Sequence, residues 1–233
     1  MKNLAKAALV MVSICVLTSA GETQDASKPT VVPVTKAAFH LFTFQDENMS
    51  LENVTLPPGA STGYHSHDQD LVFVITGGAK IKNQVLGKDP VELEFKRGEI
   101  KFAAYTKTPG AHQITNLEKE KAMRLLAVGI VYPEPGRYTV STRPEKYELG
   151  LDNDRVRAWR LNLNPGESAP VVKQTAPGAR FVISGGTIVE KRPGKPDQPM
   201  VLKEHDFIAL PMEERGIENV GTSAVELVDI ELK

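Results

Sequence analysis

Cysteine is almost absent from this chain: one residue in 233, Cys15, lies in the N-terminal segment. A single cysteine forms no intramolecular disulfide and provides no cluster of thiolates for a metal. If the N-terminal segment is removed, any metal ligand must be His, Asp or Glu. Stability must then come from the packing of apolar side chains.

Long runs of one charge are also absent. The chain has 28 basic and 29 acidic residues, with a formal net charge of −1. This balance argues against a nucleic-acid partner and against a polybasic membrane-surface protein. The glycine-rich phosphate-binding pattern GxGxxG, a Ser/His/Asp order and a cysteine nucleophile are absent too. Nucleotide-dependent and covalent hydrolytic mechanisms therefore rank low.

The first 20 residues have the features of a secretory signal peptide. Lys2 and Lys6 precede an apolar run over 7–17, and small residues follow up to Ala20. The run is too short to span a bilayer. We expect cleavage near Ala20, a periplasmic or secreted protein without stable membrane insertion, and a formal net charge that changes from −1 to −3.

Two alternatives remain for this N-terminal segment. The chain could be a lipoprotein modified at Cys15, but Ile14 is bulky where a small residue is normally needed. It could also keep the segment as an uncleaved membrane anchor. Residues 21–35, polar at first and then proline-bearing, are predicted to form a flexible leader.

Helical periodicity is hard to find in the rest of the chain. Short stretches rich in Val, Ile, Phe, Leu and Tyr alternate instead with Gly, Pro, Asn and Asp. This pattern predicts an all-β fold, either a barrel or a sandwich. The expected strands include 71–76, 91–95, 100–104, 123–131, 155–163, 181–184 and 225–232.

The chain contains an internal repeat. The segment 73–78, Phe-Val-Ile-Thr-Gly-Gly, has a counterpart in 181–186, Phe-Val-Ile-Ser-Gly-Gly. Each is preceded by an apolar segment that ends in Pro-Gly and is followed at a distance by an asparagine, Asn116 or Asn219. We interpret this as a duplication, with one domain over 36–135 and a second over 136–233.

Histidines form the clearest functional signal. His65 and His67 are two residues apart on an expected strand, so their side chains share a face about 7 Å apart along it. A third histidine, His112, and a carboxylate would complete a set of nitrogen and oxygen donors suited to iron, manganese, nickel, copper or zinc. The alternatives are an exposed pair of loop histidines for the first two and a solitary surface histidine for His112.

These residues resemble the motifs of the cupin superfamily. Gly59, His65 and His67 match its first motif, and His112 with Asn116 matches the end of its second. The resemblance implies two tandem antiparallel jelly-roll-like β-barrels, a bicupin, with one divalent transition metal in the mouth of the first. It also implies a small-molecule ligand or substrate. We expect a monomer or homodimer, because the second barrel can cover an edge that would otherwise be open.

The carboxylate departs from the family pattern. Leu71 stands where the family has Glu, but the first copy is one residue shorter than the second between its glycines. That shift places Asp70 in the Glu position, as a metal ligand or catalytic base. The alternative is a surface turn residue beside Asp68, which would leave a site of three histidines and water.

The remaining candidates are weaker. His40 and His205 have no partner at a suggestive spacing, so we expect packed or surface roles. The segment 105–110 is either a lid over the metal or a longer hairpin loop. The second copy has Val172 and Gln174 at the histidine positions.

The second copy also has Arg215 at the position of the third histidine, and guanidinium does not deprotonate to bind a metal. We therefore expect this half to be metal-free. Arg215 would either form a salt bridge with Glu213, Glu214 or Glu218 or hold an anion.

Three histidines, with or without a carboxylate, leave open positions on a metal, as substrate or dioxygen binding requires. Similar cupins include dioxygenases, oxalate-degrading enzymes and isomerases, and the missing second site weighs against oxalate decarboxylation. The leading hypothesis is an exported metal-dependent dioxygenase for a small organic substrate. The rival is a non-catalytic bicupin that binds a metal or small ligand as a carrier, sensor or structural component; a scaffold that binds nothing is a third.

Overall fold

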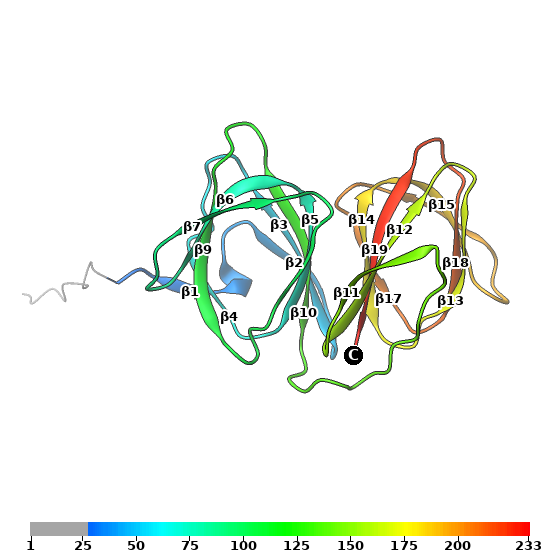
Figure 1. Cartoon of the computed structure of the whole chain (residues 1–233), viewed down its shortest axis with the longest axis horizontal. Helices are drawn as coiled ribbons and strands as arrows, with labels where there is room; N and C mark the ends of the chain where they lie inside the picture. Colours follow the sequence, from blue (N-terminus) through cyan, green and yellow to red (C-terminus); the bar gives the residue numbers. More distant parts are fainter. Residues whose placement is uncertain (1–27) are drawn as a thin grey trace, which may run out of the picture.

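Two β-barrels lie side by side in the computed structural model, which describes residues 28–233 (Figure 1). They are joined by the segment 131–146, which contains no strand. No helix in the described part of the chain is long and apolar enough to cross a membrane. The expected signal peptide, its cleavage near Ala20 and Cys15 all lie outside the described residues.

The first barrel consists of two five-stranded sheets, ordered β1-β4-β9-β6-β7 and β2-β3-β10-β5-β8. Apart from the parallel pair β1 and β4, the strand pairs in these sheets are antiparallel. The strands are β1 (Val31–Pro33), β2 (His40–Gln45), β3 (Met49–Leu56), β4 (Tyr64–His67), β5 (Leu71–Gly77), β6 (Ala79–Val85), β7 (Val91–Phe95), β8 (Ile100–Ala103), β9 (Gly110–Asn116) and β10 (Met123–Ile130).

The second barrel has a five-stranded sheet, ordered β11-β12-β19-β14-β17, and a four-stranded sheet, ordered β13-β18-β15-β16. Its strands are β11 (Tyr147–Asp152), β12 (Val156–Leu163), β13 (Ser168–Lys173), β14 (Gly178–Ser184), β15 (Gly186–Lys191), β16 (Gln198–Leu202), β17 (Phe207–Leu210), β18 (Glu214–Asn219) and β19 (Val225–Leu232). The predicted all-β class and the predicted tandem barrels are confirmed, as are the expected strands.

The predicted flexible leader is wrong for its last residues. Val31–Pro33 forms β1, which pairs in parallel with β4, and Val34–Lys36 forms a single turn of 3-10 helix, η1. Two adjacent valines favour an extended strand. Proline is tolerated here because, within the described residues, β1 is an edge strand with a partner on one side only. The leader residues 21–27 lie outside the described part.

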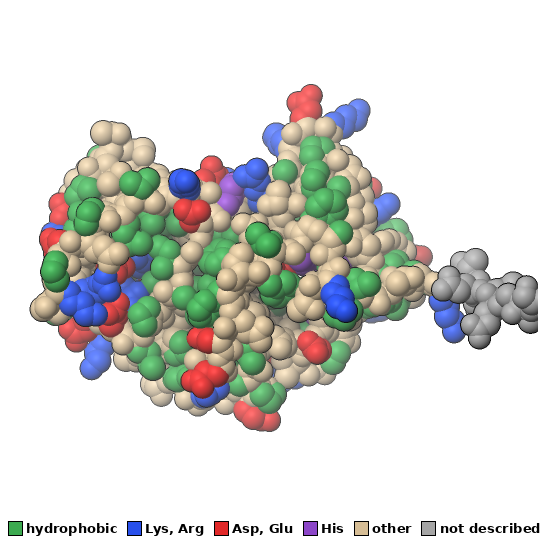
Figure 2. Space-filling model, turned by 180° about the vertical axis from the view of Figure 1, so that it is seen from behind, with side chains coloured by type: hydrophobic (Ala, Val, Ile, Leu, Met, Phe, Trp, Pro, Cys, Tyr) green, Lys and Arg blue, Asp and Glu red, His purple; other side chains and the backbone are tan. Residues whose placement is uncertain are grey.

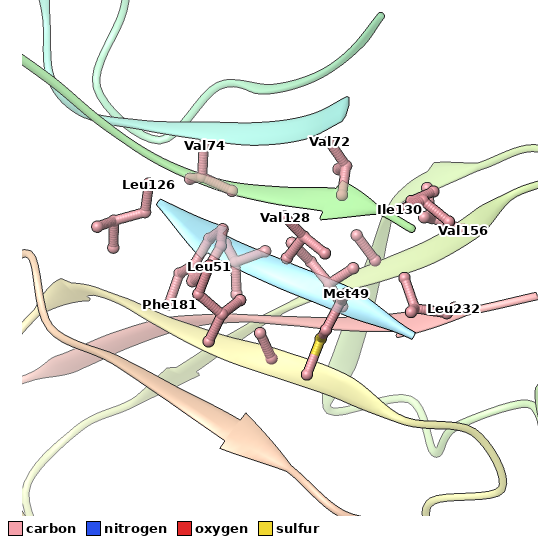
Figure 3. Close-up of a cluster of buried hydrophobic side chains, with 14 of the residues drawn as sticks. Met49, Leu51, Val72, Val74, Leu126, Val128, Ile130, Val156, Phe181 and Leu232 are labelled. Atoms are coloured by element: carbon pink, nitrogen blue, oxygen red, sulfur yellow. The ribbon is translucent and has the colours of Figure 1, made fainter. Parts of the chain in front are cut away.

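The largest apolar core lies between the barrels, where the sheet containing β3, β10 and β5 packs against the sheet containing β12, β19 and β14 (Figures 1 and 3). Along β5, Val72 and Val74 point into this interface, whereas Phe73 and Ile75 point into the first barrel. Both faces of these strands are therefore buried, which explains why they appear in the sequence as continuous apolar runs.

Asn116 and Asn219 occupy equivalent places at the ends of β9 and β18. The Nδ2 group of Asn116 donates to the backbone oxygens of Leu56 and Lys121, and that of Asn219 donates to those of Leu163 and Ser223. Both asparagines are fully buried. The repeated asparagine is thus a structural crosslink between strand ends, in the barrel with the histidines and in the one without them.

Candidate metal centre

The three predicted histidines meet on the inner face of the first barrel. On β4, the side chains of His65 and His67 are buried whereas that of Ser66 between them is exposed. His112 on β9 lies directly opposite His65 in the antiparallel register. One nitrogen from each of the three imidazoles can be chosen so that all lie within 4.8 Å of one another. The cluster could therefore hold a divalent metal ion.

Backbone and amide oxygens fix the orientation of two of these rings. His65 Nδ1 donates to the Gly63 carbonyl at 3.1 Å, and His112 Nδ1 donates to Asn83 Oδ1 at 2.9 Å. With Nδ1 protonated in both rings, each Nε2 keeps its lone pair for a metal. The Nε2 atoms of His67 and His112 lie 3.2 Å apart. Two nitrogens about 2.1 Å from one ion are separated by a distance of this order.

Burial keeps the cluster neutral. It lowers the pKa of His65, and burial together with the neighbouring histidines lowers the pKa values of His67 and His112 to about 3. Neutral imidazole is the form that binds a metal. The donor set of three neutral nitrogens therefore fits the group that the cupin motif implies, and imidazole suits iron, nickel, copper and zinc.

Asp70 lies outside this group of three. Its Oδ2 is 2.8 Å from Nε of Arg155, which belongs to the second barrel, and its Oδ1 accepts a hydrogen bond from the Thr106 backbone at 2.9 Å. Asp70 is 2% exposed, so it is not a surface turn residue. Both of its oxygens are engaged away from the histidine nitrogens.

His40 and Glu52 also line this site, although the sequence predicts a packed or surface role for His40 and no role for Glu52. The His40 ring centroid is 4.7 Å from that of His65, and His40 Nε2 is 3.5 Å from Glu52 Oε1. Burial lowers the pKa of His40 to about 4 and raises that of Glu52 to about 7. A signal for Glu52 was present, since it interrupts the apolar set formed with Val54 and Leu56 on the inner face of β3.

A cavity of about 410 Å³ opens beside the histidines. Its polar lining includes His40, Glu52, Asn83 and Lys101 with the three clustered histidines. Most of the wall is apolar and consists of Val54, Leu71, Phe73, Ile81, Leu93, Phe95, Phe102, Ala103, Ile114 and Leu125. Phe73, Phe102 and Tyr105 line this cavity without filling it, so there is room for a small organic molecule beside the nitrogens.

The loop 104–109, which joins β8 to β9, contributes Tyr105 to the cavity wall. The Tyr105 ring stacks on that of His67, with centroids 4.6 Å apart and an angle of 12° between the planes. The segment therefore does more than connect two strands, because it covers one face of a candidate ligand.

The second barrel has no comparable group of potential ligands among residues 28–233. Val172 packs in its apolar core, and Gln174 Nε2 donates to the backbone oxygens of Ala176 and Leu210. Arg215 Nη2 lies 3.2 Å from Glu213 Oε1, which agrees with the salt-bridge alternative rather than with a free anion site. His205 lies in the turn between β16 and β17, beside Glu204.

Comparison by sequence finds neither a family model nor a curated protein that matches this chain. Comparison by structure finds many matches. AerE from Microcystis aeruginosa is 13% identical, with a TM-score of 0.63, and the alignment covers 84% of this chain and 98% of AerE. YhaK from Escherichia coli is 15% identical, with a TM-score of 0.58, and covers 83% and 93%.

Two further structural matches bear on the fold. A variant of the oxalate decarboxylase of Bacillus subtilis is 13% identical, with a TM-score of 0.54, over 80% of this chain and 69% of the enzyme. A cupin 2 conserved barrel domain protein from Leptotrichia buccalis is 9% identical, with a TM-score of 0.51, over 83% and 88%. At these identities the likeness shows the fold: two tandem cupin-type β-barrels.

Proposed function

We propose that the protein is a metal-dependent dioxygenase that acts on a small, mainly apolar organic molecule in the cavity of the first barrel. The observation that carries this proposal is the convergence of three neutral imidazoles on the wall of an open, largely apolar cavity. A structural metal site is normally closed by four protein ligands. Three histidine ligands leave positions for substrate and dioxygen.

His65, His67 and His112 would hold the ion, which is iron, manganese, nickel, copper or zinc. When bound, the ion would supply Lewis-acid or redox chemistry at the wall of the cavity. Asn83 and the Gly63 carbonyl orient two of the ligands. Glu52 is the buried carboxyl of the cavity, and with its pKa near 7 it can hold or release a proton beside a bound molecule.

The substrate class follows from the wall. Ten apolar side chains surround the space, among them the aromatic rings of Phe73, Phe95 and Phe102. Lys101 adds one basic group. A molecule with an apolar body and one or two oxygen substituents would bury its body against these rings and keep its polar groups near the histidines. A small, highly charged substrate would leave the apolar wall uncovered.

Export is part of this proposal. The charged start at Lys2 and Lys6, the apolar run over 7–17 and the small residues before Ala20 support it. Sequencing the N-terminus of the protein from a periplasmic or culture fraction tests export; an intact Met1 in the cytoplasmic fraction would contradict it.

Acidic and basic side chains are interspersed on the face shown in Figure 2, without a continuous region of one sign.

The experiment for the site is elemental analysis after reconstitution with each candidate ion, followed by measurement of dioxygen consumption with a panel of small aromatic and diketone molecules. The test variant is His65→Ala/His67→Ala. The control is His205→Ala, which removes a histidine of the second barrel. We expect about one equivalent of metal and substrate-dependent oxygen uptake in the wild type and the control only.

Two other results are informative. Stoichiometric metal without turnover of any molecule that binds would favour the non-catalytic carrier, sensor or structural role. No bound metal after reconstitution, in a wild type that is folded, would overturn the metal site and leave a scaffold.

A further inference from the structure

The loop 104–109 is attached to the first barrel through Asp70. The Thr106 backbone N–H donates to Asp70 Oδ1 at 2.9 Å, and the Asp70 backbone N–H donates to Thr106 Oγ1 at 3.0 Å. These two reciprocal bonds join the loop to the start of β5, three residues after His67. The residue before Thr106 is Tyr105, whose ring stacks on His67. The position of Asp70 therefore sets the position of Tyr105.

The second barrel holds Asp70 from the other side. Arg155 is the last residue of the turn that joins β11 to β12, and its Nε lies 2.8 Å from Asp70 Oδ2. Both side chains are almost completely buried, with 2% and 3% exposure. Arg155 Nη2 also donates to the Tyr132 carbonyl, and its guanidinium lies 5.0 Å from the centre of the Tyr132 ring. The guanidinium is thus fixed at the junction of the barrels.

The same turn reaches the loop at a second point. Lys107 Nζ lies 3.4 Å from Asp154 Oδ2, in an exposed ion pair. An exposed pair contributes little by itself. Removing one partner of a buried pair costs much more, because the other charge stays buried without compensation. The contact between Arg155 and Asp70 is therefore the one that decides where the loop lies.

We propose that Arg155 of the second barrel is a positioning residue for the metal centre of the first. It holds Asp70, Asp70 holds Thr106, and the loop thereby keeps Tyr105 against His67 as one wall of the cavity. The second barrel thus controls access to the site. This also gives a reason for the aspartate where the cupin motif has Glu: the carboxylate is used to join the barrels. The consequence for metal exchange rests on the proposed metal site, whereas the ordering of the loop does not.

The first test is hydrogen–deuterium exchange of the metal-free protein, followed in peptides that cover the loop. Arg155→Met should speed exchange of the loop amides at least tenfold, since it breaks a buried pair, and Arg155→Lys should restore part of the protection. The control is Arg97→Met. Arg97 also joins the barrels, through Glu204 at 3.2 Å and Ser184 at 2.9 Å, but it contacts nothing in the loop.

A second variant keeps the test decisive if Arg155→Met does not fold. Thr106→Val preserves the ion pair and the shape of the side chain, and it removes the oxygen that accepts from the Asp70 backbone. It should raise loop exchange and leave the other peptides of both barrels unchanged. Loop protection equal to that of the wild type in Thr106→Val and in a folded Arg155 variant would overturn the proposal.

The last measurement is the rate at which zinc leaves the loaded protein for a coloured chelator. We expect Arg155→Met to release zinc about tenfold faster, at an unchanged stoichiometry, because the wall beside His67 opens. If zinc does not bind even to the wild type while the loop still loosens in Arg155→Met, the metal site fails and the positioning role stands. If zinc binds and neither rate changes, the positioning role fails and the metal site stands.

Discussion

The Nε2 atoms of His67 and His112 face each other at 3.2 Å, although the two residues belong to different strands. Because His112 Nδ1 donates to Asn83, its Nε2 is the unprotonated nitrogen. In the metal-free protein a proton on His67 Nε2 can therefore be shared with His112. When the His67 proton is on Nδ1 instead, the Nε2 lone pairs of both rings are free for an ion, and the antiparallel pairing of β4 with β9 keeps them aimed at one point.

Two matched substitutions distinguish a metal ligand, His67, from a histidine that only lies beside the ligands, His40. His67→Asn should abolish stoichiometric metal binding, because it removes one of three converging nitrogens. His40→Asn should leave the stoichiometry unchanged, since His40 packs edge-on against His65 and its Nε2 faces Glu52 rather than the cluster. Equilibrium dialysis with zinc measures both. Loss of metal in the His40 variant would show that it is a fourth ligand.

The hydrogen bond from His112 to Asn83 should tune the affinity. Asn83→Ala removes the acceptor for Nδ1, so the imidazole can rotate or change its tautomer. Loss of such a partner typically weakens metal binding by about 10–100-fold. Competition with a chelator of known affinity measures the change. Gln113→Ala is the control, because its amide bonds to Gln84 on the same pair of strands and makes no contact with the cluster. Equal affinities in both variants and the wild type would contradict this role.

The metal-free protein should lose stability as the pH falls. Unfolded histidine titrates near pH 6.5, whereas burial and neighbouring histidines lower the pKa values of His67 and His112 to about 3. Between these values the unfolded chain binds more protons, so each such histidine lowers the free energy of unfolding by up to about 1.4 kcal/mol per pH unit.

Glu52 acts in the opposite direction. Burial raises the pKa of Glu52 to about 7, so its contribution to the free energy of unfolding increases as the pH falls from 7 to about 4.5. This gain offsets the loss of stability caused by roughly one of the histidines. Urea unfolding of chelator-treated wild type and His67→Asn at pH 7.0 and 5.5 checks the net effect. The wild type should lose about 1 kcal/mol more than the variant over this interval. Identical losses would mean that His67 titrates normally.

Much of the fold could be predicted because β-strands leave a local pattern. Strand positions followed from apolar runs and turn residues, and the duplication followed from two copies of the same hexapeptide. His65 and His67 could be found because they alternate on one strand, and His112 because, with Asn116, it resembles the end of the second cupin motif. The formation of strand β1 could not be predicted, since the partner that it has among residues 28–233 is β4, more than thirty residues away along the chain.

The surroundings of the histidines depend on contacts between residues that are far apart in the sequence. Asp70 stands at the position expected for a ligand, but Arg155 lies 85 positions later and reaches it only after the barrels pack. His40 looked isolated because its neighbours are on β3 and β4. The spacing of residues along one strand identifies potential metal ligands. Whether such a residue binds a metal or an arginine depends on the tertiary structure.

The buried asparagines should be structural in both barrels. Asn219→Ala removes two hydrogen bonds from Nδ2 to backbone oxygens and should lower the free energy of unfolding by about 1–3 kcal/mol. Asn116→Ala should cost a similar amount and leave zinc affinity within a few-fold, because its amide faces the end of β3 and the segment just before β10 rather than the histidines. Urea unfolding and zinc dialysis measure the two effects. If only Asn116→Ala were destabilised, the two asparagines would not have the same structural role in the two barrels.

The apolar core between the barrels should make them unfold together. Phe181 on β14 is fully buried in this core, and it lies with Leu51 and Val128 of the first barrel in the same cluster (Figure 3). Phe181→Ala should therefore lower the free energy of unfolding by about 3–5 kcal/mol. Val201→Ala, at a residue 72% exposed on β16, should change it by less than about 0.5 kcal/mol.

The number of transitions is the decisive observation in that experiment. If the second barrel unfolds, Leu51 and Val128 of the first barrel are exposed to water. If the first barrel unfolds, Phe181 of the second is exposed. Loss of either barrel therefore uncovers the apolar face of the other. Thermal unfolding followed by tyrosine signals and by Trp159, which is buried in the second barrel, should give coincident midpoints that shift together in Phe181→Ala. A separate early transition of Trp159, with the rest of the signal unmoved, would show that the first barrel is stable alone and that the shared core does not couple the two.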